Sequence, residues 1–219
     1  MSGPGTIGIS TAGALLLAAS VASGVSASNE YDQAIHCGAK TVHDAQLLKQ
    51  NREAVVFRKH RTSPSGRKVS VAYACLRDAD PIRRLKRSEF TRSALDPRLA
   101  GHYVAFREII EQNEVGGEQS IAVLNIETGR LKVEQDAAVN GAEDSWLYSF
   151  VVKRNGSVAW VGLREQGDQL LLKVDSRTAG QPQQLDSGSD FHLHPLRLNN
   201  DKTRVVWIKQ GNQHSAPLY

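Results

Sequence analysis

The amino-acid sequence predicts an all-β protein of about four repeats, each about 50 residues long. Three observations support this prediction: a strand phrase that recurs, turn residues that separate the strands, and the lack of long helical periodicity. The phrase is a short apolar run that ends in an aromatic residue. It occurs as AVVF at Ala54–Phe57, YVAF at Tyr103–Phe106, SVAW at Ser157–Trp160 and RVVW at Arg204–Trp207, with intervals of 49, 54 and 47 residues between the aromatic residues.

Further candidate strands surround each phrase. A preceding strand is clearest at Ser149–Lys153 and Leu193–Leu198. A second apolar run follows each phrase, at Val69–Leu76, Ile121–Ile126, Leu170–Val174 and, more weakly, Ser215–Leu218. The first three repeats add a short third run, at Ile82–Leu85, Arg130–Val133 and Gln183–Leu185. About four short antiparallel strands per unit of about 50 residues are typical of propeller blades, so we expect a β-propeller-like fold.

Turn-forming residues stand where the predicted hairpins reverse direction. Asn155 and Gly156 are the strongest signal, because Asn-Gly adopts positive φ at little cost. The other predicted turns are Ser63–Gly66, Glu127–Gly129 and Asn199–Asp201. Only Asp44–Gln50 has the composition of a short helical turn.

The fourth repeat lacks a strand in this scheme, because it holds only two or three before Tyr219. A propeller completes its last blade with a strand from the other end of the chain. Gly38–Gln46 is the candidate for that strand. The alternative is an open or irregular stack of the four units.

Some of these phrases resemble a known family. Asn200–Trp207 and Arg154–Trp160 resemble the hairpin "Asp-Gly-Lys-x-hydrophobic-Ala-Phe" of TolB-type propellers, and Ile121–Gly129 is similar to their following strand, "hydrophobic-x-Asp-x-Thr-Gly". Over residues 37–219 the chain also resembles exported actinobacterial repeat proteins that end in a phrase like Ser215–Leu218. It departs at Asn200–Lys202, where the turn glycine is missing, in its first repeat, and in lacking the Trp-Asp pairs of WD-repeat blades. The resemblance implies an architecture and no catalytic residues, because propeller functions reside in variable loops.

The segment before Glu30 carries no charged side chain. It is most apolar from Ala12 to Ala22 and ends in the small residues Val25-Ser26-Ala27, which predicts a signal peptide over residues 1–27. It is short and rich in Ser and Gly for a membrane span, so no span is expected after cleavage. Because no Lys or Arg precedes it, an uncleaved anchor or a misplaced start are the alternatives. Residues 28–219 are then expected to form one secreted or extracytoplasmic domain.

Two cysteines, Cys37 and Cys75, remain in the predicted mature chain. An even number of cysteines in an exported protein indicates a disulfide. The alternative is a pair of free, buried thiols.

Charge is distributed unevenly along the chain. Residues 28–110 carry 16 basic and 9 acidic side chains, whereas residues 111–219 carry 11 and 14. A basic cluster can bind anionic polymers, and an exported protein meets envelope polysaccharides before nucleic acid. Few aromatic residues accompany the cluster, so we expect no nucleic-acid partner. The candidate polyanion-binding residues are Arg58, Lys59, Arg61, Arg67, Lys68, Arg83, Arg84, Lys86 and Arg87, and the alternative is a solvated charged face.

Motifs for catalysis are weaker. Asp190, His192 and His194 alternate, so in a strand they would share one face and form a candidate metal site; the alternative is a polar strand rim. Ser65–Lys68 matches Ser-x-x-Lys, but it lies in a predicted turn rather than on a helix. We therefore assign no catalytic residue, no other metal site and no cofactor.

The leading functional hypothesis is an exported, non-enzymatic, propeller-like module that binds a protein, polysaccharide or polyanion at the cell envelope. One alternative is a hydrolase or lyase with its site on the propeller face. Another is a purely structural repeat domain.

Overall fold

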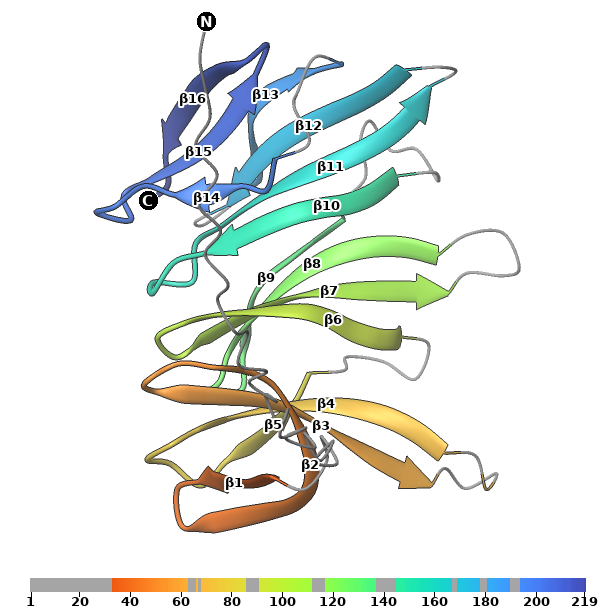
Figure 1. Cartoon of the computed structure of the whole chain (residues 1–219), viewed down its shortest axis with the longest axis vertical. Helices are drawn as coiled ribbons and strands as arrows, with labels where there is room; N and C mark the ends of the chain where they lie inside the picture. The colour runs from red at the N-terminus through yellow and green to blue at the C-terminus, as the bar shows by residue number, and fades with distance from the viewer. Residues whose placement is uncertain are drawn as a thin grey trace, which may run out of the picture.

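The computed structural model describes residues 33–62, 66, 68–85, 91–111, 117–136, 145–166, 169–177, 181–189 and 194–219. These residues form sixteen strands, β1–β16, in four antiparallel sheets that follow one another along the chain (Figure 1). The prediction of an all-β chain in about four antiparallel units is therefore confirmed. The predicted signal peptide, residues 1–27, lies outside the described residues.

Consecutive strands pair with each other in every sheet. Sheet 1 contains β1 (Gln33–Cys37), β2 (Lys40–Gln50), β3 (Ala54–Thr62), β4 (Lys68–Leu76) and β5 (Ile82–Arg84). Sheet 2 contains β6 (Thr91–Ala100), β7 (Tyr103–Glu111), β8 (Gly117–Asn125) and β9 (Leu131–Asp136). Sheet 3 contains β10 (Ser145–Val152), β11 (Val158–Gln166), β12 (Gln169–Arg177) and β13 (Gln183–Gly188). Sheet 4 contains β14 (Arg197–Leu198), β15 (Arg204–Lys209) and β16 (Asn212–Pro217).

Asparagine side chains close the turn before the aromatic phrase in three sheets. Asn51 Oδ1 accepts backbone hydrogen bonds from Glu53 and Ala54 at 2.8 and 2.7 Å. Asn155 Oδ1 accepts one from the backbone of Ser157, and Asn199 Oδ1 accepts one from the backbone of Arg204. An Asn side chain that bonds the backbone two or more residues later reproduces the geometry of a turn, which explains why the chain reverses at these points.

The sheets lie face to face along the long axis of the molecule, from sheet 1 at the bottom of Figure 1 to sheet 4 at the top. Strand β6 packs on β2 and β4, β10 packs on β6, β7 and β8, and β14 packs on β10. Sheets 1 and 4 thus lie at opposite ends of the stack, and the described residues do not close it into a ring. The hypothesis that Gly38–Gln46 completes the fourth sheet is wrong, because this segment forms the β1–β2 turn and most of β2 in sheet 1. The expected helical turn at Asp44–Gln50 is also wrong.

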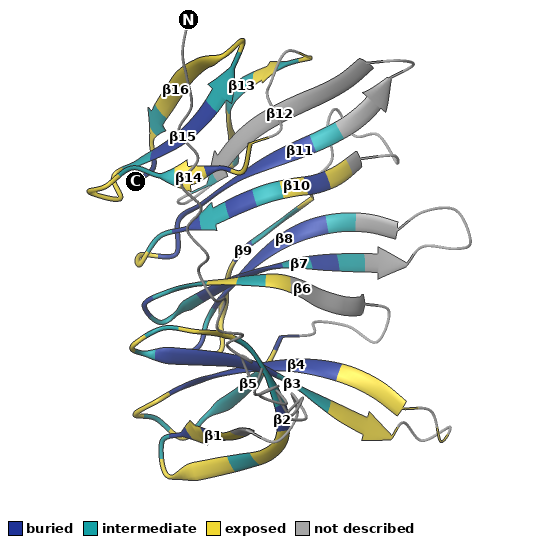
Figure 2. Cartoon of the chain, viewed as in Figure 1, coloured by how far each residue is buried: buried dark blue, intermediate teal, exposed yellow. Residues whose placement is uncertain are grey.

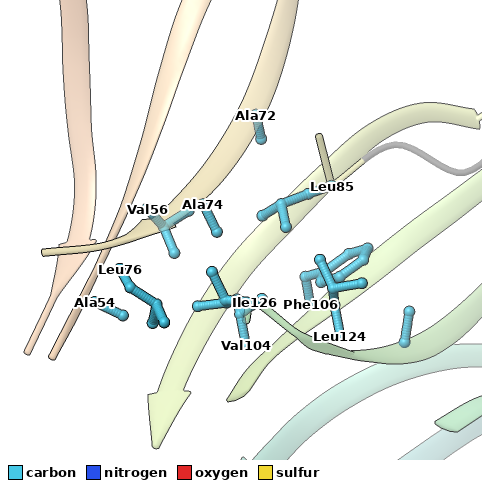
Figure 3. Packing of buried hydrophobic residues seen from close by; sticks show 11 residues of the cluster. Ala54, Val56, Ala72, Ala74, Leu76, Leu85, Val104, Phe106, Leu124 and Ile126 are labelled. Carbon is cyan, nitrogen blue, oxygen red and sulfur yellow. The ribbon is translucent and has the colours of Figure 1, made fainter. Parts of the chain in front are cut away.

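Each interface between sheets buries the aromatic residue of the later repeat. Phe106 packs against β3 and β4 of sheet 1, where apolar side chains from both sheets meet (Figure 3). Trp160 packs against sheet 2, and Trp207 packs against sheet 3. Phe57 occupies the equivalent position in sheet 1 and faces away from sheet 2. These four rings are 2%, 1%, 6% and 1% exposed, respectively, so the predicted repeat register is confirmed.

A hairpin covers Phe57 in place of a preceding sheet. We call residues 33–44, which are β1 and the first part of β2, the capping hairpin. In a flat sheet β1 would lie about 14 Å from β4, three strands away. Instead the Cα atoms of Cys37 and Cys75 are 5.6 Å apart and a disulfide joins them. The hairpin therefore folds across the outer face of sheet 1, as seen at the bottom of Figure 1, and the predicted disulfide is confirmed.

Candidate anion-binding face

The outer face of sheet 1 changes from apolar to basic along its strands. On β3, the side chains of Val55 and Phe57 belong to the buried cluster beneath the capping hairpin. Because strand side chains alternate between faces, Lys59 and Arg61 continue on the same face as Phe57. Figure 2 shows the corresponding change from buried to exposed surface toward the far ends of β3 and β4. The face therefore places positive charge next to an aromatic core.

Phe57 and Tyr73 form a cross-strand pair on this face. Their ring centroids are 5.6 Å apart, with the planes inclined by 20°. The Arg61 guanidinium lies over the Tyr73 ring, with Cζ 5.4 Å from its centroid. A guanidinium at this distance is attracted by the ring and is held along the strand toward the capping hairpin. The aromatic pair therefore positions a cation as well as filling the core.

Three cations surround this pair. Lys59 and Arg61 extend from β3, and Arg84 lies directly opposite Tyr73 on β5. Within the described part of the chain, none of these three forms an ion pair with a carboxylate. Their positive charge is thus available to an anionic ligand.

A pocket of about 380 Å³ opens between the capping hairpin and this face. The hairpin supplies one wall, and β3, β4 and β5 supply the others. Its lining combines apolar, hydroxyl and charged groups: Thr41, Val42, His43, Asp44, Phe57, Lys59, Arg61, Tyr73 and Ile82. The hydroxyl group of Tyr73 is buried and has no hydrogen-bond partner in the part of the chain that the structure describes. The pocket is therefore within the range of small-ligand sites, at its smaller end.

Arg83, another predicted cation, points the opposite way. Its side chain donates hydrogen bonds to the carbonyl oxygens of Ile126 and Glu127, at 3.2 and 2.9 Å, and so ties sheet 1 to the β8–β9 turn of sheet 2. Gly129 in that turn has φ +72°, and a Cβ there would come within 2.9 Å of the Arg83 guanidinium carbon. This close approach explains the glycine, and it gives Arg83 a structural role between the sheets.

The remaining predicted cations are divided as well. Arg58 pairs with Ala72 in the register of β3 and β4, which places it on the face toward sheet 2. Lys68 is exposed at the start of β4 and alternates onto that same face. Arg67, Lys86 and Arg87 lie outside the described residues. The structure thus brings together Lys59, Arg61 and Arg84 out of the predicted set.

The candidate metal site is only partly described. Asp190 and His192 lie outside the described residues, and His194 is exposed. No group of three or more His, Cys, Asp or Glu side chains within the described part of the chain is arranged to hold a metal ion.

Sequence reasoning missed a polar cluster at the edge of the stack where the turns before the aromatic phrases lie, on the left of Figure 1. His102 lies between two carboxylates, with Nε2 3.4 Å from Glu53 and Nδ1 3.2 Å from Glu127. Arg154 of sheet 3 pairs with Glu53 of sheet 1. The repeat alignment contains the signal for this cluster, because Glu53, His102 and Arg154 all precede an aromatic phrase by a few residues.

No family model matches the chain, and no curated protein matches it significantly. The described residues include no helix with the length and apolar character that a membrane-spanning helix needs.

Proposed function

We propose that this protein is an exported, non-enzymatic binding module that holds anionic polymers of the cell envelope on the outer face of sheet 1. The observation that carries the proposal is the convergence of Lys59, Arg61 and Arg84 around Tyr73, beside a pocket. Clustered cations attract a polyanion because each neutralised anionic group releases a bound counterion.

Export is supported by the disulfide. Cys37 and Cys75 are both fully buried and bonded to each other. Disulfides persist in oxidising compartments and are rare in the cytosol. Together with the apolar segment before Glu30, this favours an extracytoplasmic location.

A propeller-like architecture is part of the proposal. Its support is the succession of antiparallel meanders, each stacked on the one before it and each burying one aromatic residue against that neighbour. In stacked repeats each unit contacts only its neighbours, so the outer face of sheet 1 is not used for packing between sheets.

The test compares retention on immobilised polygalacturonate and immobilised heparin at low salt. Reversing three charges with Lys59→Glu, Arg61→Glu and Arg84→Glu should lower the salt concentration at which the protein elutes, and should remove retention near physiological salt. The fold should persist, because Arg61 and Arg84 are exposed and Lys59 is only half-buried, and charges near the surface contribute little to stability.

A matched control reverses three exposed cations elsewhere: Arg52→Glu, Arg130→Glu and Lys202→Glu. It changes the net charge equally and should elute close to wild type. If both triple variants elute at the same salt concentration, binding depends on net charge alone and the proposed face is wrong. The proposal also fails if the wild type is not retained by either polymer.

A further inference from the structure

The pocket under the capping hairpin combines apolar and cationic side chains, whereas binding an anionic polymer requires only the cations. Its walls include the apolar side chains of Val42, Phe57 and Ile82 beside the two cations Lys59 and Arg61. A bare phosphate or sulfate would leave those apolar walls uncovered. The lining instead matches a ring that has an apolar body, several hydroxyl groups and one acidic group.

Tyr73 provides a second, independent indication of a ligand. Its side chain belongs to the buried cluster, with an exposure of 8%, yet its hydroxyl group has no hydrogen-bond partner in the described structure. Buried polar groups are nearly always hydrogen-bonded, because leaving one unpaired is costly. The aromatic ring would pack equally well as phenylalanine, so core packing does not explain the hydroxyl.

The charge of the lining limits the charge of the occupant. Lys59 and Arg61 supply two positive charges, and Asp44 on the opposite wall supplies one negative charge. His43 beside Asp44 adds an imidazole that can donate or accept a hydrogen bond. A single carboxylate fits this balance, whereas a phosphate monoester carries about 1.5–2 negative charges at neutral pH.

We propose that this pocket binds one uronic-acid-type sugar unit, with its carboxylate paired to Lys59 and Arg61. In the structure the Tyr73 hydroxyl has almost no accessible surface and the Arg61 guanidinium lies over its ring, so the proposal includes a movement of Arg61 toward the carboxylate that lets one sugar hydroxyl group hydrogen-bond to Tyr73. The proposal rests on the proposed function and names the unit of the polymer that is recognised. It also requires the capping hairpin, because Thr41–Asp44 form one wall. The Cys37–Cys75 disulfide holds that wall in place.

The experiment titrates the full chain with galacturonic acid, glucose and glycerol phosphate, using calorimetry or NMR chemical shifts. We expect galacturonic acid to bind at least about tenfold more tightly than either of the other two. Tyr73→Phe should weaken galacturonic acid binding about tenfold, the effect of losing one buried hydrogen bond of about 1.4 kcal/mol. Tyr148→Phe, which changes an exposed tyrosine on sheet 3, serves as the matched control.

Stability provides an internal check. Because the Tyr73 hydroxyl has no partner among the described residues, Tyr73→Phe should leave the melting temperature unchanged or raise it. A clear decrease in melting temperature would show that the hydroxyl has a structural partner, and it would overturn the inference. Unchanged galacturonic acid affinity in Tyr73→Phe, or equally tight binding of glycerol phosphate, would do the same.

The outcomes separate this inference from the proposed function. The exposed cations should still retain polygalacturonate on a column in Tyr73→Phe and after the disulfide is reduced, whereas binding of the single sugar acid should be lost after reduction. Column retention without any binding of galacturonic acid would refute the pocket and leave the polymer-binding face standing. Binding of galacturonic acid with no column retention would refute the face.

Discussion

The two ends of the stack differ in the side chains that they carry on their outer faces. The outer face of sheet 1 presents Phe57 and Tyr73, and the capping hairpin and its disulfide cover them. On the outer face of sheet 4, polar side chains that bond to one another surround the buried Val206. There Arg204 donates two hydrogen bonds to Ser215, each 3.0 Å long, and Arg197 donates one to Gln213.

This difference follows from the direction of the repeat. In sheets 2, 3 and 4 the aromatic residue of the phrase faces the preceding sheet. Sheet 1 has no preceding sheet in the described structure, so its aromatic face needs another apolar cover. The hairpin provides that cover, and the space it leaves beside the basic ends of β3 is the candidate pocket. The candidate binding site is thus a consequence of how the chain covers an aromatic face.

The largest expected effect tests whether burial under the capping hairpin stabilises an aromatic ring as much as burial under a neighbouring sheet. Phe57→Ala, Phe106→Ala and Trp160→Ala should each lower the free energy of unfolding by about 3–5 kcal/mol, because each removes a fully buried ring. We expect the loss for Phe57 to equal that for Phe106 to within about 1 kcal/mol, as both are Phe→Ala changes in a packed core. Urea denaturation of each variant measures these values.

Trp146→Ala is the control for this series, because Trp146 is 38% exposed on β10 and should cost much less. If Phe57→Ala costs no more than Trp146→Ala, the capping hairpin does not replace a sheet. Silent changes at all three buried positions would refute the repeat register.

The next largest effect concerns the disulfide that holds the capping hairpin on sheet 1. Replacing both Cys37 and Cys75 by Ser opens a loop closed over 38 residues. In the loop-entropy model this lowers the free energy of unfolding by about 3–4 kcal/mol. Amide hydrogen exchange should show the greatest loss of protection in the capping hairpin, with sheet 4 affected only through global unfolding. Equal loss of protection in both end sheets would mean that the disulfide does not act at one end of the stack.

Local sequence patterns were sufficient to predict the strands of the central repeats. The aromatic phrases, the Asn turns and the apolar runs gave the correct sheet order, because each hairpin is formed by neighbouring segments. The segment Asp44–Gln50 was misjudged because Ala, Gln, Leu and Lys favour a helix, while pairing with β3 holds it in a strand. Such pairing is tertiary, and composition does not reveal it.

The sequence predicted the basic region of the candidate site but not the pocket beside it. Clustering of Arg and Lys indicated a basic region, yet it could not separate Arg61 on the outer face from Arg83, which is bonded to carbonyl groups between sheets 1 and 2. Strand alternation could have separated Arg58 from Lys59. The pocket itself exists because the capping hairpin folds back over sheet 1. The two cysteines predicted a disulfide, but they did not show which face of the sheet the hairpin covers.

The smallest expected effect concerns sheet 4, at the other end of the stack. A charged side chain, and not a disulfide, holds this sheet to its neighbour. Asp186 at β13 accepts hydrogen bonds from Trp207 Nε1 at 2.9 Å and Lys209 Nζ at 2.8 Å, and so joins sheet 3 to sheet 4. Partial burial alone would raise the pKa of Asp186, but the hydrogen bonds from Lys209, Trp207 and the Ser187 backbone outweigh it and lower that pKa.

Because the folded-state pKa lies below the unfolded-state value of about 3.9, the charged Asp186 stabilises the fold at neutral pH, and this contribution is lost as the pH falls through the folded-state pKa. Asp186→Asn should lower the free energy of unfolding at pH 7 by about 1.5–3 kcal/mol, the range for a hydrogen bond to a charged group. The difference between wild type and variant should shrink below about pH 4, whereas the loss caused by removing the disulfide should not change with pH there. Denaturation curves of the three proteins at pH 7, 5 and 3 measure both trends. A difference for Asp186→Asn that stays constant down to pH 3 would show that the carboxylate charge does not fasten sheet 4.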